Sequence, residues 1–359
     1  MSLALVLSGG APNATLMTGA LLAMEEKGVK FDVVSTSGAG AVAGLFYVAP
    51  KDTCTESALK NSVNMGIADA IYKRFPVNYK VFQKPGPMAD WYRMLTSMNP
   101  FFNMAYQGVY TNEITRLWTD SMQFMLAACC PTNLTANSKG MCAHVPWIDN
   151  AVDFEALADF DGDFYINAYN ITDHEMELFH NSELNAEHFK AAMSFPMIYP
   201  PYEMNGKQYI EGAAIDALNY KSLVNKHPEI DTIVVFDVLG IDKLIREPRN
   251  LYDSWVLSIM TPIVELAKDD TKLFELQHNS GPNKRDLLKI HYEIPEEHIP
   301  ESLDWSHSNL KRLFDIGYEA GLKFYEEHKD KLCCSSTRME PPKASVKPKK
   351  KGKPKLEVA

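Results

Sequence analysis

Ser37 has the sequence surroundings best suited to nucleophilic chemistry. The stretch Val33-Val34-Ser35-Thr36-Ser37-Gly38-Ala39 leads from a β-branched pair to a serine with small neighbours, and residues 41–46 favour a helix. A strand, a sharp turn, a serine and a helix, in this order, are typical of a nucleophile elbow. Small neighbours such as Gly38 avoid collisions in the turn. The start of the helix directs unpaired N–H groups to the place where an oxyanion would form.

The elbow pattern is a weak signal when it stands alone. Its usual form is Gly-x-Ser-x-Gly, and here Ser35 and Ala39 replace the two outer glycines. Turns of small residues between a strand and a helix also occur without any catalytic role. A second glycine-rich turn, Ser8-Gly9-Gly10-Ala11, could hold a phosphate at a helix start. It matches neither Gly-x-Gly-x-x-Gly nor the lysine-containing phosphate loop, so nucleotide binding is disfavoured.

The elements around these turns predict an α/β fold with a central, mostly parallel sheet flanked by helices. Apolar residues 3–7 and 32–36 predict two buried strands, and a helix is expected between them at 15–26. This order implies neighbouring parallel strands with a right-handed crossover. Further strands are expected at 164–170, 175–180, 208–211, 231–237 and 287–292, and further helices at 185–193, 251–277 and 306–328.

Residues 50–150 differ from the rest of the chain. They are rich in methionine and aromatic residues, and proline and asparagine divide them into short predicted helices. Methionine is flexible and polarizable, which suits surfaces that accept varied apolar shapes. The segment is expected to be a helical lid over an acyl-chain pocket or, equally, an ordinary helical insertion with a methionine-filled core.

Composition and charge narrow the class of protein. The chain has 359 residues, of which 46% are hydrophobic, and no apolar run is long enough to span a membrane. The start of the chain lacks the basic region of a signal peptide, and the six cysteines have no zinc-finger spacing, so a cytoplasmic protein with reduced thiols is expected. The net charge is −10, although residues 341–359 carry seven lysines against one glutamate. Residues 336–359 are therefore expected to form a disordered tail after a domain spanning 1–335.

Taken together, the sequence resembles the patatin-like phospholipases, a family of lipid acyl hydrolases. Four segments carry the resemblance, in the order that the family has them: 7–14, 35–39, 191–201 and 209–213. The first looks like the glycine-rich oxyanion loop and the second like the elbow. The third contains Tyr199-Pro200-Pro201, and the fourth, Tyr209-Ile210-Glu211-Gly212-Ala213, lies where the family has Asp-Gly-Gly or Asp-Gly-Ala. The resemblance covers about 1–48 and 160–330 and implies a three-layer patatin-like fold.

The resemblance implies a serine–acid dyad without histidine, metal or cofactor. Ser37 would be the nucleophile and Glu211 the general base, in place of the family's aspartate. Backbone N–H groups of Gly9, Gly10 and Ala11, together with Gly38, would bind the oxyanion and substrate. The departures are Ser35, Ala39, Ala11 and Asn13 at positions where the family has glycine or a basic residue, and the longer Glu211. Asp216 lies five residues past the motif and is not favoured as the base.

Two functions follow from these observations. The first is an acyl hydrolase that cleaves carboxylic esters of phospholipids or related lipids, with acyl transfer as a variation of the same chemistry. The second is a catalytically weak or inactive patatin-fold protein that binds a lipid or a partner. The expected partners are a lipid or acyl-ester substrate and, peripherally, a membrane contacted through the 50–150 segment or the lysine-rich tail. No nucleic acid partner is expected.

Overall fold

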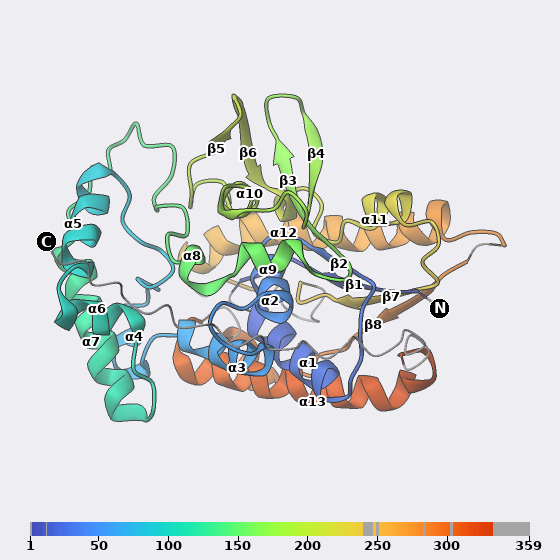
Figure 1. The fold of residues 1–359 in the computed structure, drawn as a ribbon, viewed down its shortest axis with the longest axis horizontal. Coiled ribbons are helices and arrows are strands. Elements are labelled where there is room, and N and C mark those ends of the chain that lie inside the picture. The colour runs from blue at the N-terminus through green and yellow to red at the C-terminus, as the bar shows by residue number, and fades with distance from the viewer. Residues whose placement is uncertain are drawn as a thin grey trace, which may run out of the picture.

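The fold is organised around a mixed sheet whose central strands are parallel (Figure 1). The computed structural model describes residues 2–11, 13–239, 247–248, 251–282, 284–301 and 304–332. Within them the sheet has eight strands in the order β5-β6-β3-β2-β1-β7-β8, and β4 pairs with β3. The strands are β1 Leu3–Leu7, β2 Val33–Thr36, β3 Asp163–Asn170, β4 Glu175–His180, β5 Tyr202–Met204, β6 Lys207–Glu211, β7 Thr232–Phe236 and β8 Asp286–Lys289.

The central strands β1 and β7 are buried on both faces, which explains their almost continuous apolar sequences. Successive side chains of a strand point to opposite faces, so β1 divides between two cores. Leu3, Leu5 and Leu7 join one core with α1, α2 and α13, whereas Ala4 and Val6 join the other with α11 and α12. The sheet thus lies between two helical layers, as the α/β prediction requires.

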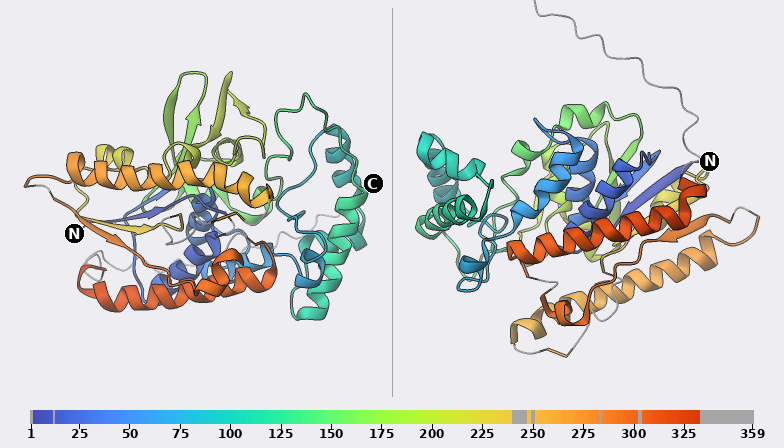
Figure 2. Two further views of the ribbon diagram at one scale, coloured as in Figure 1. Left: turned by 180° about the vertical axis from the view of Figure 1, so that it is seen from behind. Right: turned by 90° about the horizontal axis from the view of Figure 1, so that it is seen from below.

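Helices follow the strands in the alternation that the sequence predicts. Figure 2 shows α13 crossing beneath the sheet beside α1, with α12 on the opposite side. The two helices α1 and α13 pack closely because Gly19 of α1 and Gly317 of α13 each face the partner's backbone. The main helices of the domain are α1 Ala14–Glu26, α2 Ala39–Val48, α10 Ala186–Ala192, α11 Tyr220–Lys226, α12 Leu251–Leu273 and α13 His307–Leu332.

Residues between β2 and β3 contribute most of the remaining helices. The three helices α5, α6 and α7 form a lobe at one end of the molecule, away from the sheet (Figures 1 and 2). The helices of this stretch are α3 Thr55–Asn61, α4 Asp69–Tyr72, α5 Pro87–Ser97, α6 Pro100–Gln107, α7 Glu113–Cys129, α8 Ile148–Ala151 and α9 Phe154–Ala158. Short 3-10 or π turns are η1 Ser62–Met65, η2 Gly212–Ala214, η3 Phe274–His278 and η4 Glu296–Glu301.

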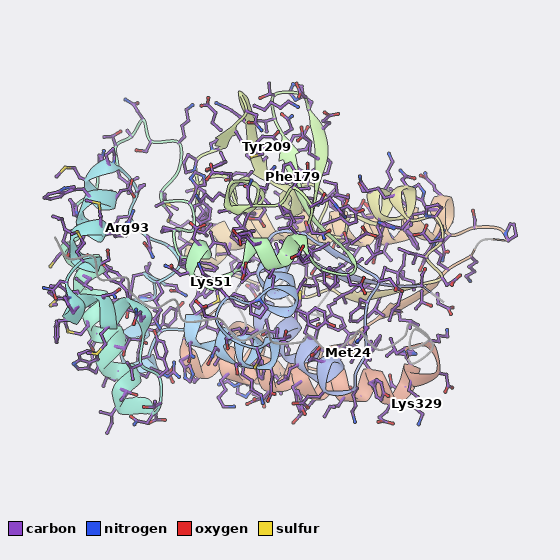
Figure 3. All side chains as sticks on the ribbon, viewed as in Figure 1. Met24, Lys51, Arg93, Phe179, Tyr209 and Lys329 are labelled. Atoms are coloured by element: carbon purple, nitrogen blue, oxygen red, sulfur yellow. The ribbon has the colours of Figure 1, made fainter. Side chains whose placement is uncertain are left out.

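The lobe leaves many large apolar side chains exposed. Figure 3 shows the side chains around Arg93 of α5 extending outward from these helices. We call the exposed apolar side chains of α5, α6, α7 and the adjoining Met98 the lobe surface. It consists of Met88, Trp91, Met94, Leu95, Met98, Phe101, Met104, Ile114, Leu117, Trp118 and Met125.

Most predicted elements are confirmed, and one strand is misplaced. The strand expected at 287–292 is instead β8, Asp286–Lys289, which pairs with Thr232–Val235 of β7. After it, the Ile290 amide still donates to the Val235 carbonyl at 3.0 Å, and residues 291–292 lie beyond the ladder. Helix α11 was not predicted. The four cysteines in the described residues are free thiols, and no helix there combines the length and hydropathy needed to cross a bilayer. The tail expected at 336–359 lies outside the described residues.

Candidate active site

Ser37 lies in a sharp turn between β2 and α2, as the elbow pattern predicts. The turn depends on Gly38, whose φ of 48° and ψ of −125° are unfavourable for a residue with a side chain. Gly40 lies against the backbone carbonyl of Leu7, so the first turn of α2 crosses close to the end of β1. The Ser37 amide donates to the Leu7 carbonyl at 3.0 Å, which fixes the serine at the end of the sheet.

The Ser37 hydroxyl is buried and has two acceptors in reach. Its Oγ lies 2.7 Å from Oδ1 of Asn167 and 3.0 Å from the backbone oxygen of Asp216. A serine has one hydroxyl proton, so only one of these two can receive it at a time. Asn167 is fully buried, and its Nδ2 donates to the same Asp216 oxygen at 2.9 Å. Sequence reasoning missed Asn167, although an asparagine at an inward position of a buried strand is unusual enough to be a signal.

Glu211 ends β6 beside this cluster. The register of β3 and β6 places it opposite Ala168, next to Asn167, and its amide donates to the Ser194 carbonyl at 3.1 Å. Its carboxyl fills the space that a side chain at Gly38 would occupy, because a Cβ built there would collide with Oε1. The carboxyl is buried, and burial raises its pKa to about 8. Glu211 therefore lies at the elbow but is mostly protonated at neutral pH.

The glycine-rich loop after β1 presents backbone donors next to the elbow. Among the described residues, no hydrogen bond uses the amides of Gly9, Gly10 or Ala11, nor those of Gly38 and Ala39. A Cβ added to Gly9 would lie 2.6 Å from Cβ of Ala213, which follows Glu211 by two residues. The loop, the elbow and the Glu211 turn therefore meet at one point. Backbone N–H groups without a protein acceptor remain available to a ligand, and such a set can stabilise an oxyanion.

Ser8 stabilises the glycine-rich loop through two hydrogen bonds of its hydroxyl group. Its Oγ accepts a hydrogen bond from the amide of Val238 at 3.1 Å and donates to the Gly9 carbonyl at 3.1 Å. Gly10 has a φ of 122° and packs against Val238 and Leu239, which follow β7. The loop is thus shaped by the chain after β7 as well as by its own glycines.

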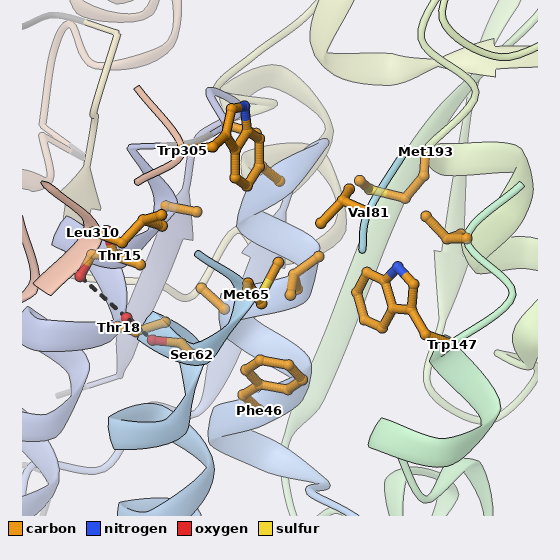
Figure 4. Close-up of a pocket in the computed structure, with 16 residues that line it drawn as sticks. Thr15, Thr18, Phe46, Ser62, Met65, Val81, Trp147, Met193, Trp305 and Leu310 are labelled. Carbon is orange, nitrogen blue, oxygen red and sulfur yellow. Dashed lines mark hydrogen bonds between the residues drawn. The ribbon is translucent and has the colours of Figure 1, made fainter. Parts of the chain in front are cut away.

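An apolar cavity of ≈ 50 Å³ begins beside the elbow (Figure 4). Ala11 of the loop and Ala39 of the elbow helix line it, and Val42, Ala43 and Phe46 continue the wall along one face of α2. Its other walls come from α1, from the segment between β2 and β3, from the end of α10, and from the start of α13 with the residue two positions before it. They consist of Ala14, Thr15, Thr18, Ser62, Met65, Val81, Val145, Trp147, Met193, Trp305 and Leu310.

Asp216 contacts Ser37 and Asn167 through its backbone oxygen and not through its carboxylate. Its backbone oxygen accepts from Ser37 and Asn167, while Oδ1 accepts from the amide of Asn219 at 2.5 Å. Burial raises the pKa of its carboxyl.

Among the described residues, the one group of carboxylates close enough to share a cation lies away from Ser37. Asp173, Glu175 and Glu177 belong to the hairpin of β3 and β4, where Lys207 already pairs with Asp173 at 2.9 Å and Glu177 at 3.2 Å. The elbow itself holds one carboxyl, one amide and one hydroxyl. These groups suit proton transfer and acyl chemistry without a metal ligand set.

A serine in a strand–helix elbow, a buried acid and an apolar cavity lie next to one another at the end of an α/β sheet. The family model of the patatin-like phospholipases matches residues 5–224, and the chain belongs to this family. That match includes the loop, the elbow and the Glu211 motif. The resemblance inferred from the sequence is therefore confirmed.

Similar proteins include a lysophospholipase and a phospholipase A2. The chain is 23% identical over 338 residues to lysophospholipase NTE1 of Saccharomyces cerevisiae, covering 90% of this chain and 16% of that protein. The human GIVD cytosolic phospholipase A2, solved with methyl γ-linolenyl fluorophosphonate, has a TM-score of 0.44 and 11% identity, over 93% of this chain and 58% of that one. VipD of Legionella pneumophila has a TM-score of 0.39 and 14% identity, over 91% of this chain and 67% of that one.

Proposed function

We propose that the protein is a serine acyl hydrolase that cleaves carboxylic esters of phospholipids, lysophospholipids or related lipids. The observation that carries this proposal is the meeting of Ser37, the Glu211 carboxyl and unpaired backbone amides at one end of an apolar cavity. Membership of the patatin-like phospholipase family supports lipid esters as the substrate class. The similarity to a protein named as a lysophospholipase gives further support.

The proposed reaction begins with proton transfer from Ser37. Ionised Glu211 accepts the hydroxyl proton as Oγ attacks the ester carbonyl carbon. The tetrahedral intermediate then collapses, the C–O bond to the alcohol breaks, and protonated Glu211 returns the proton to the leaving alkoxide. Water, deprotonated by Glu211, next attacks the acyl-Ser37 ester. The bond between the acyl carbon and Oγ breaks, Glu211 returns the proton to Oγ, and a fatty acid is released. Attack by another alcohol in place of water would give acyl transfer.

The backbone amides have a separate role in this mechanism. Negative charge develops on the former carbonyl oxygen, and N–H groups of Gly9, Gly10, Ala11 and Gly38 would stabilise it. They are fixed before the substrate binds, so they need little reorganisation. Removing one such donor in other serine hydrolases lowers kcat by about 10²–10³-fold.

The apolar cavity is the proposed site for the acyl chain. It starts at Ala11 and Ala39, which flank the two sets of amides, and it is lined almost entirely by apolar atoms. Its volume of ≈ 50 Å³ accommodates only a short end of a chain. Met65 and Met193 are flexible side chains in its wall, and their movement would admit more of the substrate.

Labelling with a fluorophosphonate tests the proposal directly, because the probe reacts only with an activated serine in a formed oxyanion site. We expect covalent labelling confined to Ser37, followed by hydrolysis of lipid esters. Ser37→Ala should lose both. Ser35→Ala is the matched control, since Ser35 lies in the same elbow but its Oγ receives a hydrogen bond from Asn219. Labelling that persists in Ser37→Ala would contradict the mechanism.

A second function is favoured by one observation. The Ser37 hydroxyl is held by Asn167 and Asp216, and Glu211 carries a proton at neutral pH. A protein fixed in this state would bind lipid or a partner through the patatin fold with little or no turnover. Binding of a fatty acid without labelling of Ser37, in protein shown to be folded, would support this alternative.

The proposal includes a location. A lipid hydrolase meets its substrate at a bilayer, so we infer a cytoplasmic protein that contacts membranes peripherally. No metal or cofactor enters the proposed reaction.

A further inference from the structure

The lobe surface concentrates exposed apolar side chains at one end of the molecule. Of the large apolar side chains exposed among the described residues, more than half lie between residues 75 and 125. Trp91, Leu95 and Met98 follow one another at helical spacing along one side of α5 and its end, and are 54%, 43% and 74% exposed. On the neighbouring helices, the rings of Phe101 and Trp118 contact edge to face at 6.1 Å. An apolar surface of this extent marks an interaction site.

This exposure does not result from loose packing of the lobe. The hydroxyls of Thr96 and Tyr106 share a hydrogen bond of 2.8 Å between α5 and α6. Gln123 of α7 donates to the Ala105 carbonyl of α6 at 2.7 Å, and Asn112 caps α7. The lobe is therefore an ordered three-helix unit that presents its apolar side chains outward.

A buried ion pair anchors the lobe to the domain. Lys80 lies 2.7 Å from the Asp120 carboxylate of α7, and both side chains are almost fully buried. The other Asp120 oxygen accepts the amide of Ala68 at 2.7 Å, and the Asp120 carbonyl accepts from the Tyr79 hydroxyl at 2.8 Å. These bonds connect α7 to the segment 68–80, which lies between the cavity-lining residues Met65 and Val81.

Basic residues are concentrated in the segment that precedes the lobe, at 73–84, whereas the lobe helices α5, α6 and α7 hold two basic and three acidic residues. Residues 69–130 contain six basic and four acidic residues, whereas the whole chain has a net charge of −10. Lys73 and Arg74 are exposed and adjoin Phe75 and Val77, which are 50% and 58% exposed. Phe75 packs on Phe124 of α7, so this basic and apolar loop borders the lobe. Basic side chains beside exposed aromatic and aliphatic groups favour an anionic lipid surface.

We propose that the lobe surface docks onto an anionic lipid bilayer, with the apolar side chains of α5, α6 and α7 entering the headgroup region. The inference rests on the proposed function, since a lipid hydrolase must draw its substrate from a bilayer. A second copy of the chain is a poorer occupant, because it would bring the exposed Lys73 and Arg74 beside the lobe of one copy close to those of the other. Tryptophan and methionine suit the lipid boundary, where the partner has no fixed shape.

Vesicle co-sedimentation tests this docking without measuring activity. The wild-type chain should bind vesicles of phosphatidylcholine with about 30 mol % phosphatidylserine, more weakly at high salt and on phosphatidylcholine alone. The triple variant Trp91→Gln, Leu95→Gln, Met98→Gln should bind at least about tenfold more weakly. The matched control replaces Leu266, Leu273 and Leu276 with glutamine, because these are also exposed leucines of a helical region and lie outside the lobe. It should bind like the wild type.

The outcomes separate docking from catalysis. Ser37→Ala should bind vesicles fully, so vesicle binding without hydrolysis would retain the docking and reject the hydrolase. Hydrolysis of a dispersed short-chain ester without vesicle binding would retain the hydrolase and reject the docking. Equal loss of binding in the lobe variant and the α12-region control would overturn the assignment of the surface. So would a wild-type dimer that dissociates in the lobe variant while no vesicles are bound.

Discussion

The Ser37 hydroxyl donates to Oδ1 of Asn167 at 2.7 Å, although the carboxyl of Glu211 lies against the adjacent Gly38. An amide oxygen is a very weak base and cannot keep the hydroxyl proton during attack. In the proposed mechanism, the proton must therefore leave the Asn167 direction before Ser37 can react with Glu211 as base. Asn167 would then hold the Ser37 hydroxyl in place and at the same time keep its proton away from the Glu211 carboxyl.

A carboxylate in place of Asn167 should make the Ser37 hydroxyl proton easier to remove. Asn167→Asp puts an ionisable acceptor at hydrogen-bond distance from Ser37, so fluorophosphonate labelling at pH 7 should be at least about tenfold faster. The same substitution removes the donor to the Asp216 carbonyl, which should lower the free energy of unfolding by about 1–3 kcal/mol. Labelling rates and urea unfolding measure the two effects. Labelling as slow as in the wild type, in folded protein, would show that Asn167 does not restrain the serine proton.

The pH dependence of activity should report the protonation of Glu211. Burial raises the pKa of Glu211 to about 8, so about one molecule in ten has the ionised base at pH 7. Activity should rise about tenfold per pH unit below this pKa and level off above it. Glu211→Gln should lower activity by about 10²–10⁴-fold and remove this limb. A wild-type profile that is flat from pH 6 to 9 would exclude Glu211 as the base.

The same pKa predicts a loss of stability with rising pH. The pKa of Glu211 changes from its ordinary 4.5 in the unfolded chain to about 8 in the folded one. Between these values the folded state holds a proton that the unfolded state has released. Each pH unit in this window therefore lowers the free energy of unfolding by up to about 1.4 kcal/mol, and the loss is complete above pH 8. Glu211→Gln cannot ionise, so its urea unfolding should fall less steeply from pH 5 to 8 than that of the wild type. Parallel pH dependences would show that Glu211 does not hold this proton.

The sequence was sufficient for the sheet and the elbow because both depend on local patterns. The apolar runs at β1 and β2, with small residues after β2, specify strands and a tight turn without reference to distant residues. Asn167 could not be assigned in this way. Its position beside Ser37 follows from the register of β2 and β3, which pairs Thr36 with Ile166. The two contacting residues, Ser37 and Asn167, are 130 positions apart in the sequence. The raised pKa of Glu211 could not be predicted locally either, because it results from burial by several elements.

Residues 50–150 show the same limit of prediction from local sequence. Its methionines and aromatic residues fitted both a lid and a self-packed helical core, since composition does not say which side chains face outward. The structure exposes Trp91 and Met98 on the lobe but buries Ala89 and Ala105 within it. Small residues therefore form the contacts between helices, and large apolar residues remain at the surface. That arrangement depends on how the helices pack, which no single helix encodes.

Gly38 should be intolerant of any side chain. Gly38→Ala adds the strain of a positive φ and a collision with the Glu211 carboxyl and with Ala213. Gly28→Ala is the matched control, because Gly28 has a φ of 72° with open space around it. We expect Gly38→Ala to cost about 1–3 kcal/mol more in urea unfolding than Gly28→Ala, and to abolish labelling of Ser37. Equal costs would mean that the Glu211 carboxyl does not occupy the space beside the elbow.

The cavity should set the acyl-chain preference. Met193 contributes to its wall, and Met193→Ala would lengthen the space that begins at Ala11 and Ala39. The ratio of kcat/KM for a twelve-carbon ester to that for a four-carbon ester should rise about tenfold, since added buried methylenes each contribute about 1 kcal/mol or more. Ala14→Phe should fill the cavity and lower the same ratio. Met141→Ala is the control, because Met141 is exposed and does not line the cavity. If both cavity variants keep the wild-type ratio while remaining folded and active, the acyl chain binds elsewhere, and the cavity is only a packing defect beside the elbow.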